Sequence, residues 1–340
     1  MKLCITGGGT GGHLMIARAL VTSAVEKGHK VIFIGSTHGQ DQKYFSQESL
    51  FSAVYFLPTT GVVNQKGLGK LKALYKIFKA FLNSRSILKK HKIEATYSVG
   101  GFSAAPASFA SLSKKIPLFI HEQNAVEGRL NRLLKPYATR FISAYDATSP
   151  IKGYPVEETF SKTARVRKKL KTIIFLGGSH GAKAINDLAL SVCEELKQRD
   201  IKILHQAGDS DYERVKEEYK SLGVEVELYG FTKELASLIP QADLAVSRAG
   251  ASTLWELTTN SCPAFYIPYP YAAGDHQYYN AEFIVNNELG WCEREGKELK
   301  NKFLEILEVN LESKSKALKE YASTDVASQM IDDVIWNIND

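Results

Sequence analysis

The sequence predicts an α/β protein made of two domains, each built on a parallel sheet. Short β-branched and aromatic runs alternate with helical patterns through both halves of the 340 residues. Many of these runs are apolar throughout, as in parallel strands that are covered on both faces. A strand followed at once by a glycine loop and a helix occurs twice, at Cys4–His13 and at Ile173–Asn186. The length allows two hydrophobic cores.

Ten strands are expected, five in each half. Their ranges are Met1–Thr6, Lys30–Gly35, Ala95–Val99, Leu118–His121, Arg140–Ala144, Thr172–Leu176, Lys202–Gln206, Glu225–Tyr229, Leu244–Ser247 and Ala264–Ile267. The polar segment between the halves contains Pro150 and Pro155, so residues 151–169 are expected to be a linker. The domains are then 1–150 and 170–326, two Rossmann-like sheets on either side of a cleft.

Composition narrows the class of protein. No run of eighteen apolar residues occurs, and the N-terminus lacks the apolar core of a signal peptide. The four cysteines are far apart and fit reduced cytosolic thiols better than disulfides or zinc. Residues 1–164 hold 22 Lys and Arg against 9 Asp and Glu, whereas the rest holds 21 against 28. Only the first half is therefore expected to meet an anionic surface, either membrane or nucleic acid.

The first glycine loop predicts a phosphate-binding site. Gly7–His13 follows a strand, and it has five glycines and a histidine in seven residues. Glycine allows close backbone approach, and the following helix presents unpaired N–H groups to a diphosphate. A dinucleotide dehydrogenase also needs an acidic residue at the end of the next strand, where this chain has none before Asp41. The second loop, Gly177–Ala182, is shorter, and the pair of loops indicates a phosphate-bearing ligand.

Four further motifs complete a recognisable pattern. They are Val99–Phe102 (VGGF), His121–Asn124 (HEQN), Ser247–Glu256 (SRAGASTLWE) and Gly274–Ala281 (GDHQYYNA). Together with the glycine loops, their order and spacing resemble the bacterial UDP-N-acetylglucosamine:lipid I N-acetylglucosaminyltransferases, the MurG family, over nearly the whole chain. The resemblance implies a GT-B fold, with the donor nucleotide in the second domain, the acceptor against the first, and a final helix near 327–340 packing back on the first.

The implied reaction is part of cell-wall synthesis. The 4-hydroxyl of N-acetylmuramic acid in the undecaprenyl-linked precursor attacks C1 of N-acetylglucosamine, the anomeric centre inverts, and UDP leaves. Charge develops on the β-phosphate, so preorganised N–H donors lower the barrier. No cofactor and no obligatory metal are implied.

The resemblance also assigns residues to the donor. Glu256 is expected to hold the ribose hydroxyls, and Ser179 with the backbone of Ala251, Ser252 and Thr253 the diphosphate. Gln277 is expected to bind the sugar, with Asn280 either supporting it or serving as an ordinary polar helix residue. Phe231 and Thr232 resemble the segment that reads the uracil, although a core role for Phe231 stays open. Asn124 lies beside the donor sugar in the family.

The acceptor side is assigned to the first domain. His13 is the candidate general base or acceptor-orienting group, because histidine titrates near neutral pH, although it also suits a loop-capping role. Thr10, Gly11 and Gly12 of the same loop are expected to bind substrate, and Gly100 and Gly101 are expected to contact the acceptor. His121 fits a core histidine better than a catalytic one.

The segment 67–92 predicts contact with the membrane. Leu71, Leu74, Phe78 and Phe81 recur at helical spacing, with lysines 70, 72, 76 and 79 among them. Such a basic amphipathic helix suits anionic lipid, and packing of its apolar stripe on the core is an equal alternative. The expected location is the cytoplasmic face of the membrane, as a peripheral protein.

The chain departs from the family pattern at several positions. Ile16 replaces a usual proline, Phe102–Ala105 (FSAA) a usual Ser/Gly-containing segment, and His180 a usual glutamine. Glu157 stands where the family has an arginine, for which Arg165 or Arg248 are the available substitutes. Other functions left open are a glycosyltransferase with another acceptor, a UDP-N-acetylglucosamine epimerase and a silent UDP-sugar-binding protein. No known nucleic-acid-binding module is present, which disfavours a nucleic-acid partner.

Overall fold

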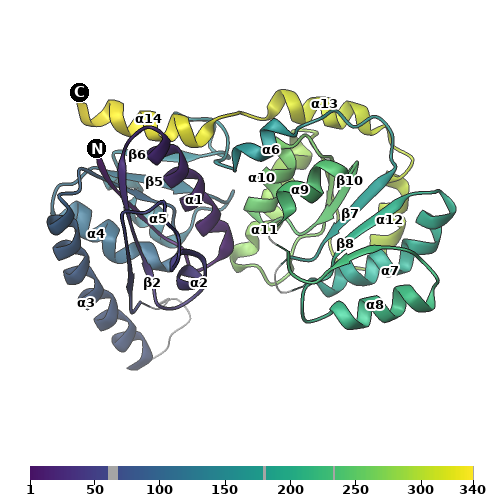
Figure 1. The fold of residues 1–340 in the computed structure, drawn as a ribbon, viewed down its shortest axis with the longest axis horizontal. Helices are drawn as coiled ribbons and strands as arrows, with labels where there is room; N and C mark the ends of the chain where they lie inside the picture. Colours follow the sequence, from purple (N-terminus) through teal and green to yellow (C-terminus); the bar gives the residue numbers. More distant parts are fainter. Residues whose placement is uncertain (60–67, 179–180, 233, 340) are drawn as a thin grey trace. The chain divides into compact units, whose positions relative to one another are not determined.

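The computed structural model describes residues 1–59, 68–178, 181–232 and 234–339, without the side chains of 68, 70–72 and 339. The chain forms two compact units (Figure 1). The first contains Met1–Val156 and Asp325–Asp340, and the second contains Glu157–Thr324.

The first unit is built on a six-stranded parallel sheet with the strand order β3-β2-β1-β4-β5-β6. In chain order its elements are β1 (Lys2–Thr6), α1 (Gly11–Glu26), β2 (Lys30–Ser36), α2 (Asp41–Phe45), β3 (Ala53–Leu57), α3 (Leu68–His91), β4 (Ala95–Ser98), α4 (Ala105–Ser113), β5 (Leu118–Glu122), α5 (Arg129–Leu134), β6 (Arg140–Ser143) and α14 (Val326–Asn339). Helices α3 and α4 pack against each other (Figure 1). Between them and the sheet lies a core that includes Cys4, Ile32 and Ala107.

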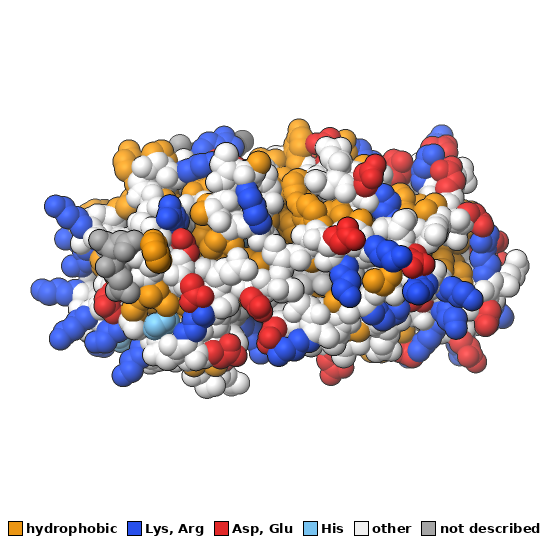
Figure 2. All heavy atoms as spheres, turned by 90° about the horizontal axis from the view of Figure 1, so that it is seen from above, with side chains coloured by type: hydrophobic (Ala, Val, Ile, Leu, Met, Phe, Trp, Pro, Cys, Tyr) orange, Lys and Arg blue, Asp and Glu red, His pale blue; other side chains and the backbone are white. Residues whose placement is uncertain are grey.

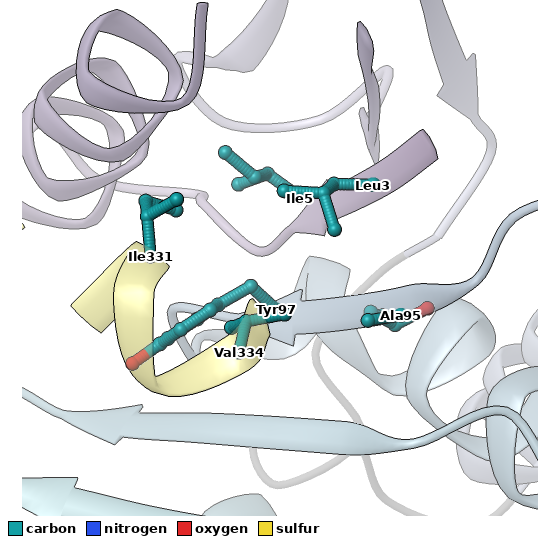
Figure 3. A pocket seen from close by; sticks show the side chains of 7 residues that line it. Leu3, Ile5, Ala95, Tyr97, Ile331 and Val334 are labelled. Carbon is teal, nitrogen blue, oxygen red and sulfur yellow. The ribbon is translucent and has the colours of Figure 1, made fainter. Parts of the chain in front are cut away.

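The last helix, α14, belongs to the first unit and packs against α1. Ion pairs fix it at Lys27–Asp332 (2.8 Å) and Arg140–Asp333 (3.5 Å). Ile331 and Val334 of α14, with side chains of β1 and β4, line a small apolar cavity (Figure 3). The chain thus returns to its first unit after completing the second.

The second unit repeats the same topology. Its parallel sheet has the order β9-β8-β7-β10-β11-β12, which matches the first sheet strand for strand. In chain order its elements are α6 (Glu158–Lys162), β7 (Thr172–Leu176), α7 (Lys183–Gln198), β8 (Lys202–Gln206), α8 (Tyr212–Ser221), β9 (Glu227–Tyr229), α9 (Leu235–Leu238), β10 (Leu244–Ser247), α10 (Ala251–Thr259), β11 (Ala264–Tyr266), α11 (His276–Asn286), β12 (Trp291–Cys292), α12 (Leu299–Ile306) and α13 (Leu311–Tyr321).

Strand order reverses between the first and fourth strands of each sheet, β1 and β4 in one and β7 and β10 in the other. In open α/β sheets, ligands bind beyond the carboxyl ends of the strands at such a switch point. The two glycine loops and the VGGF and SRAGASTLWE motifs begin at the ends of these four strands. Each unit therefore has a site that its topology alone would select.

Two strands were not predicted. β3 (Ala53–Leu57) lies at the edge of its sheet, and its first four residues are only partly buried. β12 is an edge strand of two residues, too short to leave a periodic signal. The polar segment after Pro155 is also more ordered than a linker pattern suggests, since α6 buries Phe160 and the guanidinium of Arg167 is fully buried.

Surface charge differs between the units. Figure 2 shows lysine and arginine side chains gathered over the left-hand part of the view, where the first unit lies, and mixed acidic and basic side chains over the second unit. No helix in the described part of the chain is long and apolar enough to cross a bilayer.

Candidate active site

The glycine loop after β1 is tied to the loop after β4. The Gly8 N–H donates to the carbonyl of Gly100 (3.1 Å). Gly101 has φ +79°, and a Cβ there would lie 2.1 Å from the Gly8 carbonyl oxygen. Only glycine fits such an approach, because both the backbone conformation and the space exclude a side chain. The two loops of the switch point therefore form one unit.

A buried carboxylate, which the sequence pattern did not assign, fixes the same loop. Asp41 begins α2 and is fully buried. It accepts hydrogen bonds from the N–H groups of Gly9 (2.5 Å) and Ser36 (2.8 Å), and burial raises its pKa. The amides of Gly8 and Gly9 are thus used inside the protein. The first unit offers an anion the amides of Gly11 and Gly12, which lie in the first turn of α1 and have no intrahelical acceptor.

His13 lies in the first turn of α1 and is partly exposed. Its Nδ1 is 2.8 Å from the Thr10 hydroxyl, and its Nε2 is 3.0 Å from the side-chain nitrogen of Gln123. A Cβ on Gly100 would lie 3.4 Å from Nε2, so a side chain at position 100 would crowd the imidazole. The structure therefore brings Thr10, His13 and Gly100 together, as a shared acceptor-side site requires.

His121 and Glu122 end β5 and have different environments. The fully buried His121 stacks edge-to-face on Tyr154 (5.2 Å), and burial lowers its pKa to about 3, so the ring is neutral near pH 7. Glu122 accepts from the N–H groups of Asn124 (3.0 Å) and Gly128 (2.8 Å) and from the Asn131 amide (2.9 Å). Glu122 and Asn131 thus hold Asn124 in place, a role that sequence reasoning missed although Glu122 lies inside the HEQN motif.

In the second unit, α10 begins directly after β10 and presents its first turn at the switch point. The turn contains Ala251, Ser252 and Thr253, whose amides have no intrahelical acceptor. Gly177, in the loop after β7, donates to the Gln206 carbonyl (2.8 Å). Ser179 lies outside the described residues. A helix N-terminus at this place attracts a diphosphate through its amides and its dipole.

Glu256 lies one turn further along α10 and is 6% exposed. Its Oε1 accepts from the Ser252 hydroxyl (2.7 Å), while its Oε2 is buried with no hydrogen-bond partner among the described residues. Burial raises its pKa to about 7. Burying a carboxylate oxygen without a hydrogen-bond partner costs free energy. A ligand donor such as a hydroxyl would supply the missing hydrogen bond.

The loop after β9 carries Phe231 and Thr232. The Phe231 N–H donates to the Asp209 carboxylate (2.7 Å), and the preceding Tyr229 carbonyl accepts from Ala207 (2.9 Å). The Phe231 side chain is partly exposed rather than buried in the core.

Family models match both units. Residues 3–143 match the N-terminal domain and residues 172–331 the C-terminal domain of glycosyltransferase family 28. The chain is 68% identical over 339 residues, the full length of both proteins, to the UDP-N-acetylglucosamine–N-acetylmuramyl-(pentapeptide) pyrophosphoryl-undecaprenol N-acetylglucosamine transferase of Sulfurimonas denitrificans. The chain belongs to this family of glycosyltransferases. The predicted MurG resemblance is thereby confirmed.

Solved structures agree on the fold. MurG of Acinetobacter baumannii superposes with a TM-score of 0.78 at 27% identity, over 98% of this chain and 99% of that one. The two units are therefore the Rossmann-like domains of a GT-B glycosyltransferase, as predicted. A UDP-GlcNAc 2-epimerase of Neisseria meningitidis shares the fold at a TM-score of 0.67 and 13% identity, over 99% and 100% of the chains. At that identity the likeness concerns the fold alone.

Two predicted residues of this glycosyltransferase have structural partners of their own. Gln277 in α11 accepts at Oε1 from the Tyr269 N–H (2.9 Å), which leaves its NH₂ group as the donor for a sugar hydroxyl. Asn280 is fully buried and donates to the Ala249 carbonyl (3.1 Å). It therefore ties α11 to the loop that starts α10, which fits a supporting role.

Arg165 and Arg248, the two arginines available in place of the family's arginine at position 157, have partners within the second unit. Arg165 donates to the Pro240 carbonyl and pairs with Asp243 (2.8 Å). Arg248 pairs with Glu295 (2.6 Å) and donates to the Ile267 carbonyl. Both guanidinium groups are thus engaged within the second unit. Among the described residues, no group of three His, Cys, Asp or Glu side chains is arranged to bind a metal.

Proposed function

We propose that this glycosyltransferase moves N-acetylglucosamine from UDP-N-acetylglucosamine to the 4-hydroxyl of N-acetylmuramic acid in undecaprenyl-diphospho-muramoylpentapeptide. Its relatives at up to 68% identity over the full length bear the name of this reaction. The product is the disaccharide-linked lipid precursor of peptidoglycan.

The observation that carries the donor assignment is Glu256 in α10. Its buried Oε2 lacks a partner one turn after a helix N-terminus. A nucleoside diphosphate satisfies both features at once, with its diphosphate at the amides of Ala251–Thr253 and its ribose hydroxyl at Glu256. Phe231 and Thr232 then meet the uracil, and Gln277 meets the sugar. Ser179 is assigned to the diphosphate on the sequence motif.

His13 acts as the general base in this proposal. With Nδ1–H donating to the Thr10 hydroxyl oxygen, Nε2 is the unprotonated nitrogen and takes the proton. As the acceptor O–H bond breaks toward Nε2, its oxygen forms a bond with C1 and the bond between C1 and the β-phosphate oxygen breaks. UDP leaves with that electron pair, and the configuration at C1 inverts. Amides at the start of α10 stabilise the charge that grows on the phosphate.

Acceptor binding is assigned to the first unit, at Gly100, Gly101 and the amides of Gly11 and Gly12. A second diphosphate, that of the lipid-linked acceptor, suits the start of α1 because those amides have no intrahelical acceptor. Asn124, whose loop is held by Glu122, is assigned to the donor sugar on the sequence motif alone.

Transfer to a defined acceptor tests the proposal. Purified protein with radiolabelled UDP-N-acetylglucosamine and the undecaprenyl-linked muramoylpentapeptide is expected to give a labelled lipid only when the acceptor is present. A diacylglycerol acceptor is the matched control for a different acceptor class. Release of a free labelled sugar in the absence of any acceptor indicates an epimerase and refutes the proposal.

Helix α3 is the proposed contact with the membrane. Its buried stripe, including Ala73, Ala80 and Leu88, faces the core of the unit. A second apolar stripe is exposed, with Leu74 at 47%, Phe78 at 57% and Leu82 at 48%. These positions are spaced by four residues and lie on one face of the helix. The sequence offered lipid contact and core packing as alternatives for this helix, and the two stripes allow both. Gly67 and the side chains at 70–72 lie outside the described residues.

Exposed basic side chains lie on or beside this stripe, namely Lys79, Arg85 and Lys89, whereas Lys76 lies on another side of the helix. A peripheral position on the cytoplasmic face is proposed, with the apolar side chains in the lipid interface and lysines against anionic headgroups.

Sedimentation with phosphatidylglycerol vesicles tests the membrane contact. Each lysine near an anionic surface contributes about 1 kcal/mol, so replacing both Lys79 and Lys89 by Gln should lower partitioning about 30-fold. The control replaces Lys216 and Lys220 of α8, which are exposed in the second unit. Partitioning that neither salt nor the Lys79 and Lys89 substitutions reduce would contradict this docking face.

A further inference from the structure

Gln123 is the member of the HEQN motif that has no role in the reaction as described so far. It follows β5 directly, and its side-chain nitrogen lies 3.0 Å from Nε2 and 3.4 Å from Nδ1 of His13. Its Oε1 is buried and has no hydrogen-bond partner among the described residues. The orientation of this amide is therefore set chiefly by the imidazole.

The two distances define how the amide meets the ring. An atom close to both nitrogens and in the plane of the ring would collide with the carbon between them. The amide nitrogen of Gln123 therefore lies over the face of the His13 imidazole. It restrains the ring without occupying the in-plane direction along which Nε2 accepts a proton. The Thr10 hydroxyl restrains the ring edge at Nδ1 (2.8 Å).

The backbone that carries Gln123 is itself fixed. The preceding Glu122 is 2% exposed, and its carboxylate accepts from Asn124, Gly128 and the Asn131 side chain. Three hydrogen bonds to the Glu122 carboxylate hold the loop in place, so the Gln123 amide contacts His13 from a fixed backbone. Positioning groups need such support to keep a reacting atom within a fraction of an ångström.

We propose that Gln123 is a positioning residue for the transfer reaction. Its amide restrains the His13 imidazole from the face of the ring, so that Nε2 points at the acceptor hydroxyl. The Thr10 hydroxyl restrains the same ring at Nδ1. The proposal rests on the proposed function, in which His13 is the general base.

The titratable groups around His13 come from two further elements. His121 of β5 interacts electrostatically with His13 and is neutral near pH 7, because burial lowers its pKa to about 3. Glu122, also of β5, has its oxygens occupied by three N–H donors. Asp41 of α2 is bonded to Gly9 and Ser36. A carboxylate placed at position 123 would add a charge directly over the imidazole.

The test replaces Gln123 by Glu, with the exposed Gln47→Glu in the same unit as the matched control. An opposite charge within about 4–6 Å stabilises an imidazolium by about one pH unit or more. The acidic limb of the kcat/KM profile for the acceptor is therefore expected to move up by about one unit in Gln123→Glu and to stay in place in Gln47→Glu. A structural role alone would lower activity without moving the limb.

The uncharged variant Gln123→Met removes the amide and keeps the volume. We expect kcat to fall about tenfold or more while KM for UDP-N-acetylglucosamine stays within about twofold, because a misplaced base affects the reaction step. This variant decides the question if Gln123→Glu does not fold. Unchanged kcat in Gln123→Met overturns the proposal.

Histidine NMR of the unliganded protein separates this proposal from the general-base assignment. The His13 resonance is identified by its loss in His13→Ala, and its titration midpoint is expected to rise in Gln123→Glu only. If the midpoint does not move, Gln123 does not hold His13 and the positioning proposal fails. If the midpoint moves but the kcat/KM limb does not, the contact stands and His13 is not the base, which refutes that part of the proposed function.

Discussion

Replacing Glu256 by Gln is predicted to stabilise the fold at alkaline pH while weakening nucleotide binding. Burial raises the pKa of Glu256 to about 7 from 4.5. The folded state therefore holds the proton more tightly than the unfolded state, so stability is lost as pH rises from about 4.5 through 7. Each pKa unit corresponds to about 1.4 kcal/mol, which gives a penalty of about 3 kcal/mol above pH 8. Gln keeps the Oε1 acceptor for Ser252 and carries no such penalty.

Urea unfolding of both proteins at pH 5 and pH 8.5 measures this difference. We expect Glu256→Gln to exceed the wild type by about 3 kcal/mol at pH 8.5 and by less than about 1 kcal/mol at pH 5. Calorimetry at pH 8.5 is expected to show UDP affinity at least about tenfold lower, because an ionised carboxylate that bonds a ribose hydroxyl contributes about 1.5–3 kcal/mol. Equal stability of the two proteins at pH 8.5 would refute the reasoning about the buried carboxylate.

Three further substitutions test other parts of the site and fold. His13→Ala is expected to abolish transfer and keep UDP affinity, and wild-type turnover would remove His13 from the mechanism. Gly101→Ala forces a Cβ to 2.1 Å from the Gly8 carbonyl, so kcat should fall at least about tenfold; a normal kcat shows that the two loops need not touch. The buried Arg167 guanidinium donates to carbonyl oxygens of Ala242, Arg165, Ile239 and Asn260, and Arg167→Lys should cost about 3 kcal/mol in urea unfolding. The half-exposed Arg165→Lys, as its control, should cost below about 1 kcal/mol, and equal costs would contradict the burial argument.

Most strands and glycine loops could be predicted from the sequence because they depend on the residues of the segment itself. Buried parallel strands such as Ile173–Leu176 are apolar throughout, and glycine runs such as Gly7–Gly9 are needed wherever the backbone turns with positive φ. Edge strands lack this signal, since β12 has only two residues and β3 is partly exposed. They are strands because a neighbouring strand offers hydrogen bonds, which no local pattern records.

The candidate site also has features that the sequence indicated and features that only the structure decided. Motif order and spacing indicated the family, and the resemblance then named His13, Glu256 and Gln277. Within one sheet, residues that follow neighbouring parallel strands lie at the same edge. Only the tertiary structure decided that Asp41 uses the Gly9 amide and that Gln123 lies over the His13 ring. These contacts join residues 32 and 110 positions apart. They depend on packing geometry, which a one-dimensional pattern does not contain.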